Sequence, residues 1–228
     1  ILNGTTAHVR RGAITTVIGP NGAGKSTMFK TVFGLLPVRT GSIMFDGQDV
    51  TNKTPRQMLD LGAVYIPQGR NIFAELTVKH NLELGGVALT DPSGLDGRIE
   101  RMFDRFPMLR EKASAQAGTL SGGQQKLLEV ARGLLLDPKL MLVDEPSIGL
   151  SPIMVQEVFS ILIDLASKGV TILLIEQNAK QALQMSDYGL VLEQGQTRIE
   201  DTASNILGDP RIGQLFLGGG LAGKGEAA

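Results

Sequence analysis

Short runs of aliphatic and β-branched residues recur along the chain and alternate with longer amphipathic segments. The short runs are bounded by Gly, Pro or Asp, which is typical of the buried strands of a parallel sheet. The longer segments carry apolar side chains at intervals of three or four residues and often end at glycine, which predicts helices. This alternation predicts an α/β fold. The predicted strands are 13–18, 63–66, 140–143, 170–175 and 189–192, and the predicted helices are 25–33, 55–61, 125–136, 153–167 and 179–185.

Three further strands are predicted outside this pattern, at residues 1–9, 42–45 and 196–200. Residues 42–45, Ser-Ile-Met-Phe, are interpreted as a short strand that leads into a turn at Asp46-Gly47. The sequence begins at Ile1 inside strand-like sequence, so we expect a further N-terminal piece to precede it.

The composition changes between residues 84 and 117, where β-branched runs are missing. Two charged segments there, 98–106 and 108–117, have apolar side chains at helical spacing. We therefore expect one domain, 1–228, with an inserted helical part and a flexible glycine-rich tail. The expected boundaries are 1–83 and 137–217 for the α/β core, 84–136 for the helical part and 218–228 for the tail.

Composition narrows the class of protein. The formal net charge is −1, so the chain has no overall basic field that would favour nucleic acid. It contains no cysteine, which excludes disulfides and thiolate metal sites and fits a reducing compartment. It has no run of 18 apolar residues that could span a membrane.

The residues between predicted strand 13–18 and predicted helix 25–33 form the pattern Gly-x4-Gly-Lys-Ser/Thr. Glycines at such a strand-to-helix turn let backbone N–H groups wrap a polyphosphate, and the start of the helix adds positive potential. A lysine in this pattern reaches the β- and γ-phosphates, and the serine hydroxyl binds Mg²⁺. The residues expected to bind nucleotide are Asn21, Gly22, Ala23, Gly24, Lys25, Ser26 and Thr27, with Ser26 also a metal ligand.

Two carboxylates, Asp144 and Glu145, follow the predicted buried strand 140–143 directly. Unpaired buried charge is costly, so acids in this place need a partner. A metal and a water molecule would supply one: Asp144 would hold Mg²⁺, and Glu145 would orient or deprotonate the attacking water. The alternative is a pair of solvated acids at a turn.

Two other features carry a functional and an ordinary interpretation. Gln68 follows strand 63–66 at the end of the sheet where ligands bind in open α/β folds, so it is a candidate metal ligand and catalytic residue. It is otherwise a loop glutamine. Ser121, Gly122, Gly123 and Gln124 open helix 125–136 and form either a second anion site or an ordinary capped helix start.

Taken together, these motifs resemble those of the ATP-binding subunits of ABC transporters. Gly19–Thr27 resembles the Walker A loop, Leu120–Gln124 is the unaltered signature sequence LSGGQ, and Leu140–Glu145 resembles Walker B with its glutamate. Ser147–Leu150 is similar to the D-loop, and Gln68 to the Q-loop glutamine. The resemblance implies a P-loop NTPase fold: a RecA-like core with an antiparallel β subdomain and an inserted α-helical subdomain.

The resemblance also implies an activity and partners. ATP and Mg²⁺ are the expected cofactors, and the signature residues Ser121, Gly122, Gly123 and Gln124 are expected to close on ATP held by a second subunit. That subunit is a second ABC ATPase, in a heterodimer or, alternatively, a homodimer. Two transmembrane permease subunits and, through them, a solute-binding protein outside the membrane complete the expected assembly, with no nucleic acid. The implied location is peripheral, on the cytoplasmic face of the inner membrane, with the loop after Gln68 near Phe73 facing the permease.

Three stretches, Gly19–Thr27, Glu145–Pro152 and Ile175–Ala179, are similar to the ATPase subunits of branched-chain amino-acid importers, a group that includes urea and short-amide uptake systems. Gln177 stands where most ABC ATPases have a catalytic switch histidine, and an amide can donate a hydrogen bond but cannot become a cation. The substitution suggests a heterodimer whose other site is more orthodox. No aromatic residue precedes Phe29, so the residue that stacks on adenine is expected upstream of Ile1.

Other functions use the same motifs. An ABC ATPase that serves export, such as lipopolysaccharide extraction, shares most of the pattern. A soluble ABC ATPase that acts on nucleic acid or ribosomes is a second alternative, although it usually carries coiled-coil inserts or basic patches. A nucleotide sensor that does not hydrolyse ATP is a third, suggested by Gln177.

Overall fold

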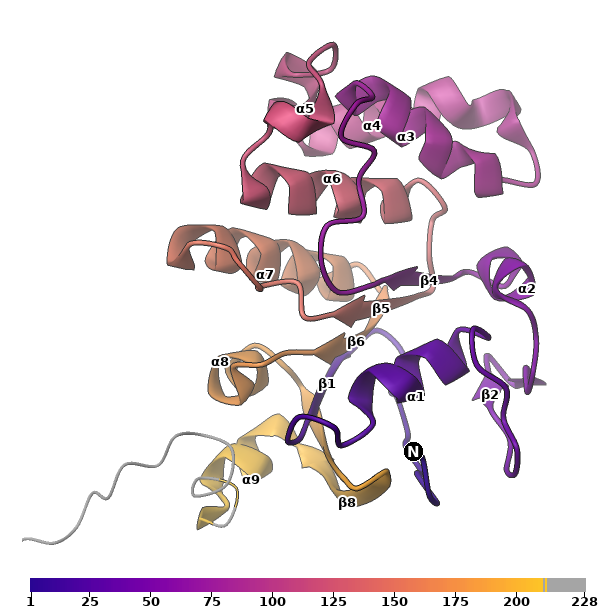
Figure 1. Ribbon diagram of the computed structural model, residues 1–228, viewed down its shortest axis with the longest axis vertical. Coiled ribbons are helices and arrows are strands. Elements are labelled where there is room, and N and C mark those ends of the chain that lie inside the picture. Colours follow the sequence, from indigo (N-terminus) through magenta and orange to yellow (C-terminus); the bar gives the residue numbers. More distant parts are fainter. Residues whose placement is uncertain (211, 213–228) are drawn as a thin grey trace, which may run out of the picture.

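A six-stranded sheet forms the centre of the protein (Figure 1). The computed structural model describes residues 1–210 and 212. The strand order is β4-β5-β6-β1-β7-β8, and all neighbours are parallel except β8, which is antiparallel to β7. The strands are β1 Ile14–Ile18, β4 Ala63–Ile66, β5 Leu140–Asp144, β6 Thr171–Ile175, β7 Tyr188–Glu193 and β8 Gln196–Thr202.

Helices cover both faces of this sheet and gather above its β4 edge (Figure 1). None of the helices in the described part of the chain is both long and apolar enough to cross a bilayer. The helices are α1 Lys25–Val32, α2 Pro55–Asp60, α3 Val78–Gly85, α4 Leu95–Arg105, α5 Pro107–Glu111, α6 Gly122–Leu134, α7 Pro152–Ser167, α8 Ala179–Gln184 and α9 Ala203–Gly208.

The two faces of the sheet bury different residues of the same strands, because successive side chains of a strand point to opposite faces. On β5, Met141 and Val143 pack in the cluster that contains the buried residues of α6 and α7. Leu140 and Leu142 pack in a second cluster with Phe29 of α1 and other residues of α1 and α2. Helices therefore cover the sheet on both faces, which confirms the predicted α/β class.

A layer of helices, α3 to α6, forms the upper part of the molecule in Figure 1. The buried side chains Leu82 of α3, Phe103 of α4 and Leu128 of α6 belong to one apolar cluster, which continues into the sheet. Arg105 of α4 forms an ion pair with Asp164 of α7, which joins this layer to the core. The inserted helical part expected from the change in composition is therefore present.

The predicted turn at Asp46-Gly47 is confirmed, in a small hairpin formed by β2 Met44–Phe45 and β3 Gln48–Asp49. Both turn residues have positive φ angles, 52° and 78°, as a tight two-residue hairpin turn requires.

The prediction of a strand at residues 1–9 is wrong. This segment contacts the β7–β8 hairpin, but its polar groups bond to a turn and a side chain instead of forming a ladder. Asn3 N–H and the Thr5 hydroxyl both donate to Gly195 O, at 2.8 and 2.5 Å, and His8 N–H donates to a Glu200 carboxylate oxygen at 3.0 Å.

The predicted helix 108–117 is too long, because α5 ends at Glu111. Backbone hydrogen bonds instead join residues 113–118 to residues 74–79, around a single antiparallel bridge between Thr77 and Gln116. Val78 N–H donates to Ala115 O at 3.0 Å, and Ala117 N–H donates to Leu76 O at 2.8 Å. The expected flexible tail, 218–228, and residues 213–217 of the expected core lie outside the described residues.

The glycine that follows α1 provides a test of the fold. Gly34 has a φ angle of 84°, and a Cβ atom built on it would lie 2.1 Å from the Lys53 carbonyl oxygen. We expect Gly34→Ala to destabilise the protein by more than about 1 kcal/mol and to lower the thermal unfolding midpoint by at least about 2–4 °C. Thermal unfolding followed by circular dichroism measures the effect.

Gly97→Ala is the matched control, because Gly97 lies within α4 and no atom lies within 4 Å of the added Cβ. This change is expected to leave the midpoint unchanged or to stabilise the protein by about 0.4–1 kcal/mol. Equal midpoints for the two variants would contradict the argument.

Candidate functional site

The loop between β1 and α1 has the backbone of an anion-binding site. Gly22 and Gly24 have φ angles of 81° and 103°, in the left-handed region that favours glycine. Gly24 immediately precedes α1 and has no side chain with which to cap the helix. No cap therefore competes for the N–H groups of the first helical turn, and the helix dipole adds positive potential there.

Lys25, the first residue of α1, lies buried in this loop. Its Nζ donates hydrogen bonds to the carbonyl oxygens of Gly19 and Pro20, at 2.7 and 3.1 Å. Burial lowers the pKa of Lys25, and the charges of Glu145 and Asp144 oppose that shift. The three charged groups predicted for the site therefore lie within electrostatic range of one another.

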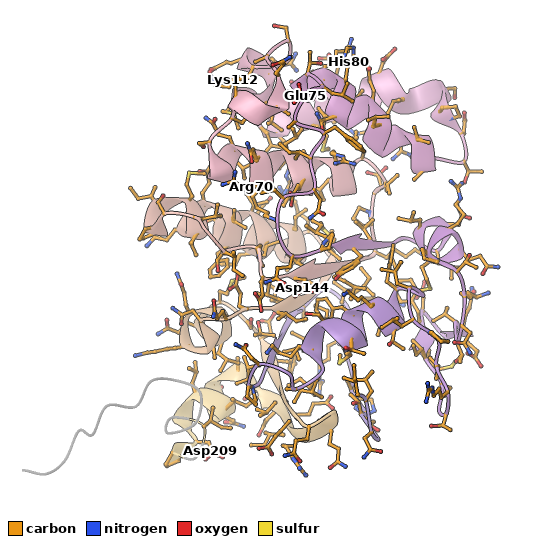
Figure 2. The ribbon with its side chains drawn as sticks, in the orientation of Figure 1. Arg70, Glu75, His80, Lys112, Asp144 and Asp209 are labelled. Carbon is orange, nitrogen blue, oxygen red and sulfur yellow. The ribbon has the colours of Figure 1, made fainter. Side chains whose placement is uncertain are left out.

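Asp144 is the last residue of β5 and lies near the centre of the molecule (Figure 2). Its Oδ1 accepts a hydrogen bond from the Ser26 hydroxyl at 3.4 Å, and its Oδ2 accepts one from the Tyr65 hydroxyl at 3.1 Å. Burial raises the pKa of Asp144, although these hydrogen bonds and nearby lysines oppose the rise. Burial and the charge of Asp144 raise the pKa of Tyr65, which therefore stays protonated and donates. The end of β5 therefore brings Asp144 next to Ser26 of the phosphate loop.

Glu145 follows Asp144 in a strained backbone conformation, with a φ angle of 48°. Its carboxylate Oε2 accepts a hydrogen bond from Gln68 Nε2 at 2.7 Å. Burial and the charge of Asp144 raise the pKa of Glu145, while Lys25 lowers it. A shift in this direction makes the Glu145 carboxylate a stronger base than a free carboxylate, which suits a general base.

The signature residues form the start of α6. The Ser121 hydroxyl accepts a hydrogen bond from Gln124 N–H at 3.3 Å, and the Gln124 side chain accepts one from Ser121 N–H at 3.0 Å. This capping box fixes the end of the helix and leaves Ser121 exposed. Arg70 lies beside it (Figure 2), and together with Gly122 it lines a pocket between the loop after β4 and the segment that follows β5.

Lys126 and Glu129 form a buried ion pair within α6, and both side chains also bond to the loop after Gln68. Lys126 Nζ donates to Glu129 Oε2 at 2.5 Å and to the Gly69 carbonyl oxygen at 2.8 Å. Glu129 Oε1 accepts from Asn71 N–H at 2.5 Å. Both charged side chains are almost completely buried, with exposed fractions of 6% and 4%. The helix that begins with the signature sequence is therefore bonded directly to the loop that carries Gln68.

Gln177 lies at the surface, two residues after the end of β6. It shares a shallow pocket with the Ser147–Gly149 segment and with Asn178. The Asn178 side chain caps α8 by accepting a hydrogen bond from Gln181 N–H at 3.1 Å. The predicted switch and D-loop positions therefore lie side by side.

The structure thus gathers most of the predicted site residues at the carboxyl ends of β1, β4, β5 and β6. Hydrogen bonds link Ser26 to Asp144 and Gln68 to Glu145. Within residues 1–210 no hydrogen bond joins the Ser121–Gln124 segment to the phosphate loop. The roles assigned to these residues stay predictions.

Sequence reasoning missed four polar residues of this region: Tyr65, Lys126, Glu129 and Glu176. Tyr65 lies in β4, whose apolar sequence predicts a buried strand but gives no sign that the Tyr65 hydroxyl bonds to Asp144. Lys126 and Glu129 are three residues apart in α6, and this spacing was the available signal for a helical ion pair. Glu176 follows β6 as Glu145 follows β5, so its place at a strand end was visible.

The chain is similar to known ATP-binding proteins over nearly its whole length. The sequence profile of the ABC transporter family matches residues 2–148. The high-affinity branched-chain amino acid transport ATP-binding protein BraG of Pseudomonas aeruginosa is 39% identical over 96% of this chain and 93% of that protein. The probable branched-chain amino acid transport ATP-binding protein LivF of Archaeoglobus fulgidus is 36% identical over 96% and 92%.

Solved structures agree with this similarity. The ADP conformation of an ATP-binding cassette of an ABC transporter superposes with a TM-score of 0.84 at 32% identity, over 95% of this chain and 92% of that one. A nucleotide-free cassette from an ABC transporter gives a TM-score of 0.84 at 31% identity, over 94% and 92%. Fold, motifs and relatives agree: the chain belongs to the ABC transporter family and is one of its ATP-binding, ATP-hydrolysing subunits.

Proposed function

We propose that this chain powers the uptake of branched-chain amino acids, or of related amino acids and amides, by hydrolysing ATP on the cytoplasmic face of the inner membrane. The observation that carries the hydrolytic part is the convergence of Ser26 on Asp144 and of Gln68 on Glu145 beside the phosphate loop. The names of the relatives BraG and LivF support the solute class.

The residues around the loop divide the chemistry among them. The backbone N–H groups of residues 22–27 and the Lys25 ammonium would hold the phosphates. Lys25 Nζ donates to the Gly19 and Pro20 carbonyl oxygens and has a third N–H with which it would donate to a phosphate oxygen. Glu145, oriented by Gln68, would accept a proton from the attacking water.

The donor atoms near Asp144 fit Mg²⁺. Ser26 Oγ and Asp144 Oδ1 are hard oxygen donors that lie 3.4 Å apart, and Gln68 would add an amide oxygen. Mg²⁺ commonly binds through one or two carboxylates together with the substrate's phosphates, and Asp144 would supply such a carboxylate. Bound there, Mg²⁺ would neutralise phosphate charge during phosphoryl transfer.

A second ATPase subunit would complete the site. The Ser121–Gln124 helix start belongs to the helical layer and makes no hydrogen bond to its own phosphate loop within residues 1–210. We infer that it closes on ATP bound by the partner, whose own signature segment closes on ATP held here. Gln177 would donate a hydrogen bond toward the γ-phosphate but cannot become a cation as a histidine can. This difference favours a heterodimer whose second site carries the usual histidine.

Lipopolysaccharide export is the second candidate. The lipopolysaccharide export system ATP-binding protein LptB of Haemophilus influenzae is 29% identical over 96% of this chain and 91% of that protein. Import is favoured because the importer relatives are 36–39% identical over the same share of the chain.

Reconstitution of the native complex tests the proposal. Tagged protein would be purified from membranes of its own host with its bound subunits and placed in liposomes that contain the solute-binding protein. We expect ATP-dependent uptake of radiolabelled leucine, with urea and acetamide as competing solutes and Lys25→Ala as the inactive control. ATPase activity that responds to lipopolysaccharide, with no uptake of any of these solutes, would favour the export alternative and refute import.

A further inference from the structure

Glu176 is a buried acid that the proposed mechanism does not use. It follows β6 and has an exposed fraction of 2%. Its carboxylate accepts three hydrogen bonds: from Ser147 N–H at 3.0 Å, from the Ser147 hydroxyl at 2.6 Å and from Gln177 N–H at 3.1 Å. Burial raises the pKa of Glu176, and these hydrogen bonds oppose the rise. Burial of a carboxylate is costly unless hydrogen bonds compensate it, so Glu176 and Ser147 depend on each other in the folded protein.

Glu145 lies on the chain segment that this carboxylate holds. β5 and β6 are neighbours in the sheet, with Asp144 in register with Ile175. Glu145 N–H donates to the Ile175 carbonyl oxygen at 2.8 Å, and two residues later Ser147 bonds to Glu176. The backbone is therefore hydrogen-bonded to the end of β6 at Glu145 itself and again at Ser147.

The backbone of Glu145 requires such support. Its φ angle of 48° lies in the left-handed region, which a residue with a side chain rarely adopts and which persists only where neighbouring contacts impose it. Gln68 holds the carboxylate head of Glu145 at 2.7 Å, but it does not hold the backbone. On the C-terminal side of Glu145, the Ser147–Glu176 contact holds the backbone two residues away.

We propose that Glu176 and Ser147 are positioning residues for ATP hydrolysis, which hold the Glu145 backbone in its left-handed conformation so that the carboxylate faces the attacking water. This inference rests on the proposed role of Glu145 as the base. The same carboxylate binds the backbone of Gln177, so it also fixes the switch position relative to Glu145.

The proposal predicts a separation of kcat from KM. The phosphate loop makes no hydrogen bond to Glu176 or Ser147 in the described structure, so ATP binding should survive their substitution. A displacement of a catalytic group by up to about 1 Å can lower the rate by up to about a hundredfold. Glu176→Gln and Ser147→Ala are therefore expected to lower kcat by about ten- to a hundredfold. The KM for ATP should change by less than about twofold.

The conservative variant and two controls make the test specific. Ser147→Thr keeps the hydroxyl and should retain kcat within about threefold of the wild type. Glu157→Gln changes an exposed acid on α7 and should have no effect. Steady-state ATPase kinetics of the purified transporter complex would be measured for all variants together with Glu145→Gln.

Each outcome has one meaning. Loss of kcat in Glu176→Gln and Ser147→Ala, with KM unchanged and Ser147→Thr active, supports the proposal. If Glu145→Gln is inactive but both other variants keep wild-type kcat, the positioning role is refuted and the role of Glu145 stands. If Glu145→Gln retains full turnover, the proposed base is wrong and the inference is refuted with it. A rise in KM that matches the loss of kcat, or a Ser147→Thr variant as poor as Ser147→Ala, also refutes the positioning role.

Discussion

Glu145→Gln is expected to lower ATP turnover by about a thousandfold while ATP binding survives. The carboxamide has the same size as the carboxylate but cannot take a proton from water. Burial and the charge of Asp144 raise the pKa of Glu145, so in the wild type the base is lost as pH falls through that raised pKa. Turnover of the wild type should therefore decline on the acid side, and this limb should be missing from the residual activity of the variant. Phosphate release by the assembled complex, measured across pH, tests both expectations.

A second consequence concerns assembly. Because the variant binds ATP without cleaving it, ATP should hold the two ATPase subunits closed, and size-exclusion chromatography should show a stable dimer in ATP but not in ADP. The exposed Glu157→Gln serves as the matched control for both experiments. Normal turnover in Glu145→Gln would show that another group activates water.

The parts of this site that could be predicted from the sequence are those formed by residues that are adjacent in the chain. The phosphate loop needs only glycines with left-handed backbone between a strand and a helix, and Gly22 and Gly24 have that backbone. The Ser121–Gln124 capping box is likewise complete within four residues, and the structure contains it. Because each of these features is formed by residues that are contiguous in the sequence, the sequence alone predicts which residues form it.

The contacts that sequence reasoning missed depend on pairing between distant segments. Ser147 and Glu176 are 29 residues apart and meet because β5 and β6 are neighbours in the sheet. Lys126 and Glu129 are charged residues of an amphipathic helix, a pattern that usually predicts a solvated face. They are buried because α6 lies between the sheet and the other helices, and the loop after β4 supplies their partners.

The strand expected at residues 1–9 failed for a related reason. The threonines and aliphatic residues of this segment are consistent with a strand, but a strand also needs a continuous row of backbone partners. His8 bonds to the side chain of Glu200 instead, and Asn3 and Thr5 share one carbonyl oxygen of the β7–β8 turn. Nothing in residues 1–9 alone indicates which partners the fold leaves for them.

Ser121→Arg is expected to reduce the ATPase activity of the assembled complex by about a hundredfold and to leave ATP binding by the isolated chain unchanged. The signature segment makes no hydrogen bond to its own phosphate loop within residues 1–210, so a large side chain there should not disturb nucleotide held by this subunit. It would instead block the proposed approach of the helix start to ATP on the partner and remove the Ser121 hydroxyl, which could donate to a phosphate oxygen there. Equilibrium binding of a fluorescent ATP analogue and phosphate release by the complex measure the two effects.

Thr54→Arg is the control for lost helix capping, because Thr54 caps α2 with the same reciprocal pair of bonds, to Gln57, that Ser121 makes to Gln124. Each variant should lose about 1 kcal/mol of stability from its cap. If the signature segment acts only as a helix start, the two variants should lose activity equally, and little. If it closes on the partner's ATP, only Ser121→Arg should abolish turnover, and the loss should appear only after assembly. Full activity of a Ser121→Arg complex would contradict the shared site, because each half would then complete its own pocket.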